Sequence, residues 1–350
     1  MPQQGKIMSA QADDPNAHVG SYLDYYISLP SAPNYAVMLE GPWGIGKTFL
    51  TKTLLSTWIQ APQKYVYVSL YGLSSPEQLD DALFGAFYRI FDSFGAKMVM
   101  GVVRGGLKAF CADPEFKRSD FLSKCYADLY GFDDLERCNM PVQQALGHIN
   151  QIVEHSGGKV VILANEAVLK KDAEYKAVKE KVVGKTLIVQ PDVDAVLTHF
   201  LKQVQSTVAR SFLTENSATI RTTFEFSNTQ NFRILQQSLW DFERFFGVLV
   251  SKQTSNTEAM ETLLTHFLAY SFELKSGGLD DDQIGRDADK FKDIFDTLAT
   301  DTDKPRQPHE ELAEKYRLMG GNRVELRGES WAKILLDGRI DSEIVDAALA

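Results

Sequence analysis

Eight consecutive residues near the start of the chain have the types and spacing of a phosphate-binding loop. They are Gly41, Pro42, Trp43, Gly44, Ile45, Gly46, Lys47 and Thr48, which fit the pattern GxxxxGK[ST]. Glycines let the backbone turn tightly, so that successive N–H groups point at phosphates. A lysine here reaches the β- and γ-phosphates, and the threonine hydroxyl is a magnesium ligand. The motif predicts binding of a nucleoside triphosphate with Mg²⁺, with Phe49 next to the loop among the contacting residues.

Two adjacent carboxylates, Asp133 and Asp134, follow the apolar end of a predicted strand. In a parallel sheet the ligand crevice lies outside the carboxyl ends of the strands. Asp133 suits a metal role, holding magnesium through water together with Thr48, and Asp134 suits the orientation of an attacking water. An acidic pair near a turn is otherwise a helix N-cap or a solvated loop. The phosphate loop upstream favours the catalytic interpretation.

Four further residues are candidates, each with an alternative. Arg137 either pairs with a carboxylate or faces a neighbouring subunit's nucleotide as an arginine finger. Asn165, at the end of an apolar run, either contacts the attacking water or γ-phosphate, or caps a helix. Arg233 either reaches the phosphates from a later helix or is a surface residue. Tyr22 either stacks on the adenine or packs against the sheet.

Apolar runs predict strands over residues 35–40, 65–70, 126–132, 159–164 and 186–190, with helices between them. The run 126–132 is the least regular, since it contains an aspartate and a glycine. After residue 192 the pattern is helical, over 193–213, 228–250, 257–274 and 284–299. The fold class is therefore α/β, with a five-stranded, mostly parallel sheet followed by an α-helical region.

These patterns divide the chain into three parts. Residues 1–191 form the α/β core, with a helical insert at about 76–124. Residues 192–300 form a helical lid or sensor region, and residues 301–350 form a C-terminal helical region.

Composition narrows the setting. The chain has 350 residues, 44% of them hydrophobic and 24% charged, as in a folded protein. Its net charge of −10 disfavours binding to nucleic acid. Three cysteines without CxxC spacing favour a reducing compartment, and no apolar stretch is long enough to span a membrane. We therefore expect a cytoplasmic protein.

Taken together, these residues resemble the KAP family of P-loop NTPases, which is related to the AAA+ and STAND ATPases. GPWGIGKT resembles the family's GxWGxGKT, and DDLER at Asp133 to Arg137 resembles DDLDR. Glu180-Lys181 before the fifth strand and Ala164-Asn165 are similar to further family features. Asn231-Phe232-Arg233 resembles a drifted copy of NPRxxKR whose second basic residue is absent. The resemblance implies an ATPase, and often in bacteria a link to exclusion of phages.

The expected function is an ATP-hydrolysing switch that changes conformation or assembles with its own copies or a partner protein. ATP is favoured over GTP because no NKxD motif is present. The rivals are a small-molecule kinase, a scaffold that binds ATP without hydrolysing it, and a DNA motor. A kinase needs an arginine-rich lid, which the sequence does not show, and the net charge of −10 disfavours a DNA motor.

Overall fold

The computed structural model describes residues 14–58, 65–93, 127–172, 174–249, 257–280, 308–318 and 328–340. They separate into two compact units, Met1–Pro191 and Asp192–Ala350. In unit 1 the elements are α1 (Ala17–Ser28), β1 (Ala36–Glu40), α2 (Lys47–Trp58), β2 (Tyr65–Ser69), α3 (Pro76–Ser93), β3 (Leu129–Asp133), the 3-10 turn η1 (Leu135–Arg137), α6 (Val142–His155), β4 (Lys159–Ala164), α7 (Glu166–Leu169), α8 (Tyr175–Val182) and β5 (Val183–Ile188).

The five strands of unit 1 form one sheet in the order β2-β3-β4-β1-β5, and every pairing is parallel. This confirms the predicted fold class. All five predicted strands exist, with β3 starting later than expected, at Leu129, and β5 starting earlier, at Val183. β4 separates β1 from β3, so the ends of these two strands lie about 10 Å apart at a spacing of about 4.8 Å per strand.

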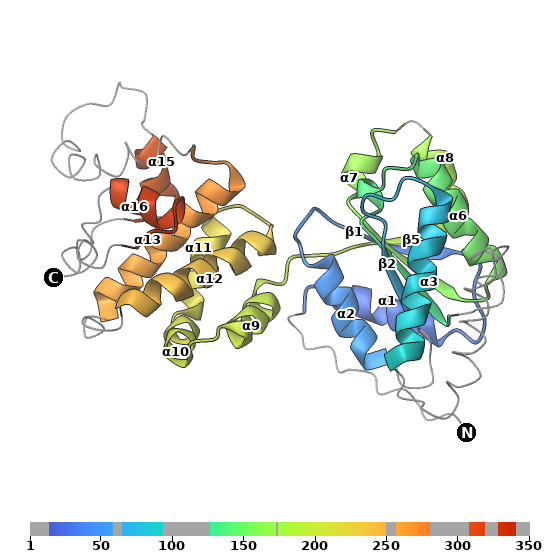
Figure 1. Ribbon diagram of the computed structural model, residues 1–350, viewed down its shortest axis with the longest axis horizontal. Helices are drawn as coiled ribbons and strands as arrows, with labels where there is room; N and C mark the ends of the chain where they lie inside the picture. The colour runs from blue at the N-terminus through green and yellow to red at the C-terminus, as the bar shows by residue number, and fades with distance from the viewer. Residues whose placement is uncertain are drawn as a thin grey trace. The chain divides into compact units, whose positions relative to one another are not determined.

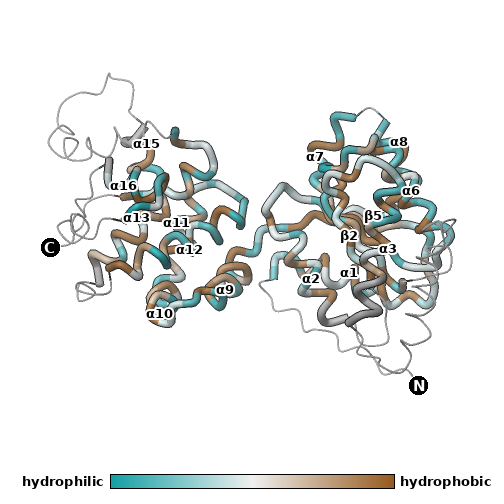
Figure 2. Tube along the Cα trace, viewed as in Figure 1, coloured by the Kyte–Doolittle hydropathy of each residue, from teal (hydrophilic) through white to brown (hydrophobic). Residues whose placement is uncertain are grey.

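Helices cover both faces of the sheet (Figure 1) because the strands alternate their buried side chains. On one face, β1 contributes Val37 and Leu39 to a core that includes α1 and α2. On the other face, β1 contributes Ala36 and Met38 to a core that includes α3, α6 and α8. Figure 2 shows hydrophobic residues concentrated along the strands. This packing fixes the carboxyl edge of the sheet, where the candidate site lies.

Unit 2 is helical in every part that the structure describes. Its helices are α9 (Val193–Gln203), α10 (Thr207–Glu215), α11 (Ser217–Phe226), α12 (Phe232–Leu249), α13 (Thr257–Ser276), α15 (Pro308–Lys315) and α16 (Gly328–Leu335). Its core is rich in aromatic rings, such as the stacked pair Phe212 and Phe246, whose centroids are 4.9 Å apart.

Two predicted helices are each divided in the structure, and one helix was not predicted. Residues 193–213 form two helices, because the backbone of Val204 is extended and Ser206 caps a new helix by accepting a hydrogen bond from the Ala209 amide. The charged helix predicted before β5 is also two, α7 and α8, and α11 was not predicted. The predicted helix 284–299 and the insert beyond residue 93 lie outside the described residues.

Among the described residues, none of the helices combines the length and apolar character that crossing a membrane requires.

Candidate nucleotide site

The loop between β1 and α2 has the backbone that its glycines were predicted to allow. Gly44 and Gly46 have φ angles of 80° and 97°, which L side chains rarely adopt. Gly41 donates its amide to the Ala164 carbonyl at 3.2 Å, which ties the loop to β4. A Cβ at Gly41 would lie 3.0 Å from the Ile45 side chain, so the loop's first turn is tightly packed. The start of the loop is therefore fixed by a hydrogen bond to β4 and by packing against Ile45.

Lys47 is the first residue of α2 and is only 8% exposed. Its ammonium donates to the carbonyl oxygens of Gly41 at 2.6 Å and of Pro42 at 3.1 Å. The charge therefore lies inside the curve of the loop, beside the positive end of the helix dipole. A phosphate in that curve would meet both.

The acidic pair ends β3 beside the phosphate loop. Asp133 is 6% exposed, and its Oδ2 accepts hydrogen bonds from the hydroxyls of Thr48, at 2.7 Å, and of Tyr67. Its Oδ1 accepts the Asp134 amide at 2.8 Å. The contact between Thr48 and Asp133 joins the two predicted motifs through side chains that are 85 positions apart.

Asp134 leaves the strand in a left-handed conformation, with φ 58° and ψ 39°. This turn separates its carboxylate from that of Asp133, and its Oδ2 accepts a hydrogen bond from the Ser69 hydroxyl at 3.0 Å. Burial, and next the charge of Asp133, raise the pKa of Asp134 above its ordinary value. A carboxylate with a raised pKa is a better proton acceptor than an ordinary one.

The donors at this edge fit a magnesium ion. Mg²⁺ prefers oxygen ligands and, in nucleotide sites, takes one or two from the protein and the rest from phosphates and water. Thr48 and Asp133 offer such oxygens within 2.7 Å of each other. In the part of the chain that the structure describes, no group of three or more His, Cys, Asp or Glu side chains could hold a metal by itself. Two protein oxygens beside a phosphate loop suit a metal whose other ligands come from phosphates and water.

Arg137 lies beside its own phosphate loop. Its guanidinium carbon is 4.9 Å from the ring centroid of Trp43 and 5.7 Å from that of Tyr71, which are cation–π distances. The Trp43 indole N–H donates to Glu136 Oε1 at 2.5 Å. Trp43 thus connects the phosphate loop to the turn after the acidic pair. Among the described residues, Arg137 forms no ion pair with a carboxylate.

Comparison with known families gives the context for this geometry. The sequence profile described as the KAP family P-loop domain matches residues 16–96 and 132–254, which is more than half of the chain. The chain belongs to the KAP family. The matched residues include the phosphate loop, the acidic pair, Asn165 and Arg233.

Comparison with solved structures finds similar chains at low sequence identity. Cdc6p from Pyrobaculum aerophilum is 13% identical over 99% of this chain and 86% of its own, with a TM-score of 0.44. The Aeropyrum pernix ORC2 protein in its ADP form is 14% identical over 100% of this chain and 96% of its own, with a TM-score of 0.46. A comparison with curated proteins finds no match.

Asn165, a candidate site residue of this KAP protein, directly follows β4. Asn165 precedes α7 but makes no side-chain cap to it, so the helix-cap alternative is not the one seen. The following residue, Glu166, is 3% exposed and forms ion pairs with Lys179 and, at 3.3 Å, with Lys170. Burial, and next a hydrogen bond with Glu166, raise the pKa of Glu40, the residue before the phosphate loop. This network braces the base of the loop.

The Glu-Lys pair named from the sequence differs from the pair in that network. Glu180 and Lys181 are exposed, whereas Lys179 reaches Glu166 from one position earlier on α8. The pattern could not distinguish these because adjacent helix positions face different directions.

Tyr22 packs against the core on one face of the sheet, which is one of the two alternatives predicted for it. Its hydroxyl is 3.3 Å from that of Tyr35, just before β1, and the Lys185 ammonium lies 5.6 Å from the centroid of its ring. Tyr35 is at the amino end of β1, whereas the loop follows the carboxyl end. The packing alternative therefore describes Tyr22. Phe49 is half-buried on α2, directly after Thr48.

Arg233 lies in unit 2, as the second residue of α12. Its side chain is exposed and forms no hydrogen bond or ion pair with the described residues, while its amide donates to Asn231 Oδ1 at 3.1 Å. Gln236, where the family motif carries a basic residue, donates to Gln203 Oε1 at 3.0 Å. Arg233 is thus an available cation on a capped helix start.

Sequence analysis missed three polar residues near the site. Tyr67 and Ser69 on β2 hold Asp133 and Asp134, and Asn16 clasps Gln190 by donating to its carbonyl and accepting its amide, each at 2.9 Å. The alternation of YVYVS places Tyr67 and Ser69 on one face of a strand, which was a usable signal. Asn16 had no local signal, because its partner is 174 positions away.

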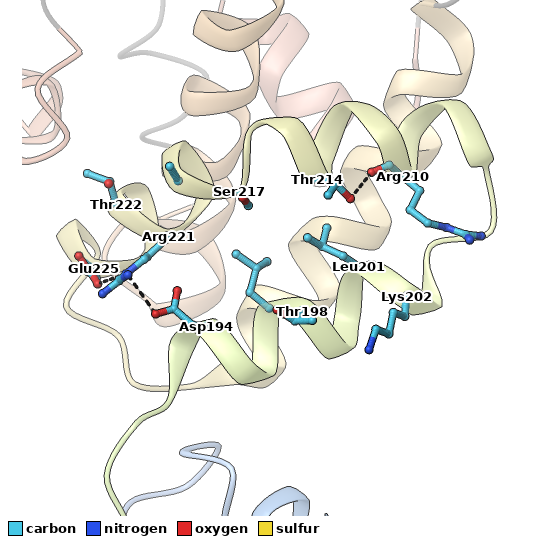
Figure 3. A pocket seen from close by; sticks show the side chains of 12 residues that line it. Asp194, Thr198, Leu201, Lys202, Arg210, Thr214, Ser217, Arg221, Thr222 and Glu225 are labelled. Atoms are coloured by element: carbon cyan, nitrogen blue, oxygen red, sulfur yellow. Dashed lines mark hydrogen bonds and ion pairs between the residues drawn. The ribbon is translucent and has the colours of Figure 1, made fainter. Parts of the chain in front are cut away.

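Whereas the carboxylates of the candidate nucleotide site accept hydrogen bonds from hydroxyls, unit 2 contains a hollow of about 680 Å³ whose carboxylates form ion pairs with an arginine (Figure 3). It lies among α9, α10 and α11, and Arg221 within it pairs with Asp194 at 3.0 Å and Glu225 at 2.9 Å. Arg210 donates to the Val204 carbonyl at 2.7 Å. Arg210 and Arg221 already have partners within unit 2, so a phosphate would have to displace these partners.

Proposed function

We propose that this KAP-family protein binds ATP with magnesium and hydrolyses it, as a switch between two conformations. One observation carries the proposal: the Thr48 hydroxyl donates to Asp133 at 2.7 Å, with Asp134 next in the chain. The contact joins the loop suited to phosphates to the carboxylates suited to hydrolysis. ATP is favoured over GTP because the sequence has no NKxD motif.

Each residue has a role in this proposal. The loop amides and Lys47 bind the β- and γ-phosphates. When bound, magnesium would be held by Thr48 and Asp133 and would offset phosphate charge. Asp134 accepts a proton as the water oxygen attacks the γ-phosphorus. The bond from that phosphorus to the β,γ-bridging oxygen breaks, and ADP and phosphate leave.

Two more cations belong to the proposal. Arg137, held between Trp43 and Tyr71, is placed beside its own loop, so we propose that it acts on its own subunit's nucleotide. We propose that Asn165 contacts the attacking water or γ-phosphate, and that Arg233 in unit 2 responds to the nucleotide. Self-assembly, or assembly with a partner protein, would be the output.

Phosphate release tests the proposal against its rivals. The purified chain with Mg²⁺ and ATP, without any acceptor, is expected to release phosphate. Release only after a small-molecule acceptor is added would indicate a kinase. Tight ATP binding without release would indicate a scaffold, and turnover that requires DNA would indicate a motor. EDTA is expected to stop the release.

Phage exclusion is the biological setting that the family resemblance suggests, and we propose it for this chain. Bacteria expressing it are expected to form fewer plaques with a susceptible phage than bacteria expressing Lys47→Ala. Equal plaque counts across a broad phage panel would reject this setting while leaving the ATPase proposal intact.

A further inference from the structure

Tyr67 reaches the acidic pair from the edge strand of the sheet. In β2, Val66 and Val68 are buried in the core on the α3 and α6 side, so Tyr65, Tyr67 and Ser69 point to the other face. Register pairs Tyr67 with Gly131 and Ser69 with Asp133. The phenol spans that two-residue step, about 6.6 Å, and donates its hydroxyl to Asp133 Oδ2.

Gly131 is what makes room for this ring. A Cβ built at Gly131 would lie 2.7 Å from Tyr67 Cδ2, and 3.2 Å from the Tyr65 hydroxyl. Real Cβ contacts are not that short, so any other residue at 131 would push the Tyr67 ring away. A glycine inside a buried strand weakens it and marks a close approach. Here the Tyr67 ring lies against the Gly131 backbone, and its hydroxyl reaches Asp133.

The donor is neutral, which matters for a metal site. An arginine or lysine on Asp133 would neutralise the carboxylate and weaken its attraction for a cation. A hydroxyl orients the carboxylate and leaves its charge in place. A tyrosine hydroxyl is protonated at neutral pH, so it can donate a hydrogen bond to the carboxylate.

We propose that Tyr67 is a positioning residue of the magnesium site: it fixes the orientation of Asp133, and Gly131 gives it room to do so. The inference rests on the proposed ATP-magnesium function. The Thr48 hydroxyl has two tasks, since it contacts Asp133 here and would be a magnesium ligand with nucleotide bound. Tyr67 donates to the same carboxylate oxygen from β2, which lies outside the phosphate loop.

The chain supplies a matched control. Tyr65 lies two residues earlier on the same strand and face, and its buried hydroxyl has no hydrogen-bond partner among the described residues. Tyr65→Phe therefore removes one buried phenolic oxygen, as Tyr67→Phe does, without removing a contact to Asp133. A general effect of losing a tyrosine hydroxyl would appear in both variants.

The experiment measures binding of a fluorescent ATP analogue while Mg²⁺ is titrated. Tyr67→Phe is expected to raise the Mg²⁺ concentration needed for half of the magnesium-dependent binding by about 10- to 100-fold, the usual cost of removing a residue that orients a metal ligand. Affinity in EDTA is expected to be unchanged. Tyr65→Phe is expected to match wild type in both conditions.

A second variant keeps the test sharp if Tyr67→Phe loses stability. Gly131→Ala retains the hydroxyl but displaces the ring, so it is expected to shift the Mg²⁺ requirement in the same direction. Thermal melting in EDTA compares how well the variants fold. A Mg²⁺ titration of folded Tyr67→Phe or Gly131→Ala that superimposes on wild type would overturn the inference alone. Wild-type binding that ignores Mg²⁺ would overturn the proposed function together with the inference.

Discussion

The phosphate-loop edge and the hollow in unit 2 both bring carboxylates into contact with donors, but the donors differ. At the edge, Asp133 is held by two hydroxyls and an amide. In the hollow, Asp194 and Glu225 are held by the guanidinium of Arg221. In an ion pair, the positive partner offsets the charge of the carboxylate and weakens its attraction for another cation. Neutral donors leave that charge in place.

The same comparison applies within unit 1. Glu166 is buried and paired with two lysines, so burial tends to raise its pKa but the lysines lower it below the ordinary value. Burial, and next the charge of Asp133, raise the pKa of Asp134, and the charge of Arg137 offsets them only in part. Burial tends to raise the pKa of both Glu166 and Asp134, so it does not explain why their shifts are opposite. The type of donor separates carboxylates that brace the fold from those available for chemistry.

The largest expected effect comes from Asp134→Asn. The amide keeps the size of the side chain but cannot accept a proton, so phosphate release is expected to fall by about 10²- to 10⁴-fold. ATP affinity is expected to change little, because Asp133 remains. The matched control is Asp194→Asn in the hollow, which is expected to leave release unchanged. Equal losses in both variants would show that the loss reflects general damage to the fold.

Lys47→Ala is expected to have the next largest effect, this time on binding. Loss of a charge-assisted contact to phosphate costs about 2–3 kcal/mol or more, which is tens- to hundreds-fold in ATP affinity. Fluorescent nucleotide binding measures it, with Lys202→Ala in the hollow as the control. Near-normal affinity of the Lys47 variant would reject the phosphate-loop assignment.

These two variants also test the switch. Asp134→Asn should accumulate with ATP bound, and Lys47→Ala should stay empty. We therefore expect opposite shifts in protease sensitivity or in size by gel filtration when ATP is added. Identical behaviour of both variants, with wild type releasing no phosphate, would favour a scaffold.

Much of the sheet could be predicted from the sequence because its strands are short apolar runs flanked by turns. The run 126–132 was the hardest, since Asp128 and Gly131 break the apolar pattern. The glycine is explained by the site, because it admits the Tyr67 ring, whereas Asp128 precedes β3, which starts at Leu129. A strand that serves a site departs from the pattern of a strand that serves only the core.

The rest of the site depends on register and could not be predicted. That Tyr67 pairs with Gly131 is a property of two strands more than 60 positions apart, with no local signal to set it. The two hydrogen bonds between Asn16 and Gln190 likewise join distant positions without a local signal in the sequence.

Arg233→Ala tests whether an exposed arginine of unit 2 that forms no ion pair with the described residues contributes to turnover, whereas an ion-paired one does not. We expect hydrolysis and the ATP-driven change in protease sensitivity to fall by about 5- to 150-fold, the usual range of coupling between sites, with a smaller loss in ATP affinity. Arg221→Ala, which breaks the ion pairs of the hollow, is the control and should leave turnover unchanged. Unchanged turnover in the Arg233 variant would identify an ordinary surface arginine.

The smallest expected effect is a shift in the pH profile on removing the Ser69 hydroxyl. Burial and the charge of Asp133 raise the pKa of Asp134, while the hydrogen bond from Ser69 favours the charged form and lowers it. Ser69→Ala should therefore raise this pKa further. Asp134 accepts a proton only when it is charged, so activity falls as pH drops through its pKa.

The acidic limb of kcat against pH should thus move to higher pH in Ser69→Ala, with little change in kcat at neutral pH. Stability should respond with the matching sign: a raised carboxyl pKa favours folding at low pH, and that contribution is lost as pH rises through the folded-state pKa. Ser69→Ala should therefore lower the melting temperature more above this pKa than below it. Ser74→Ala is the control and should move neither curve, because the Ser74 hydroxyl donates to the Gly72 carbonyl at 3.3 Å and not to a carboxylate of the described residues. An acidic limb that stays in place, or moves to lower pH, would mean that the group titrating in turnover is not Asp134, and the proton acceptor would have to be sought elsewhere along this edge of the sheet.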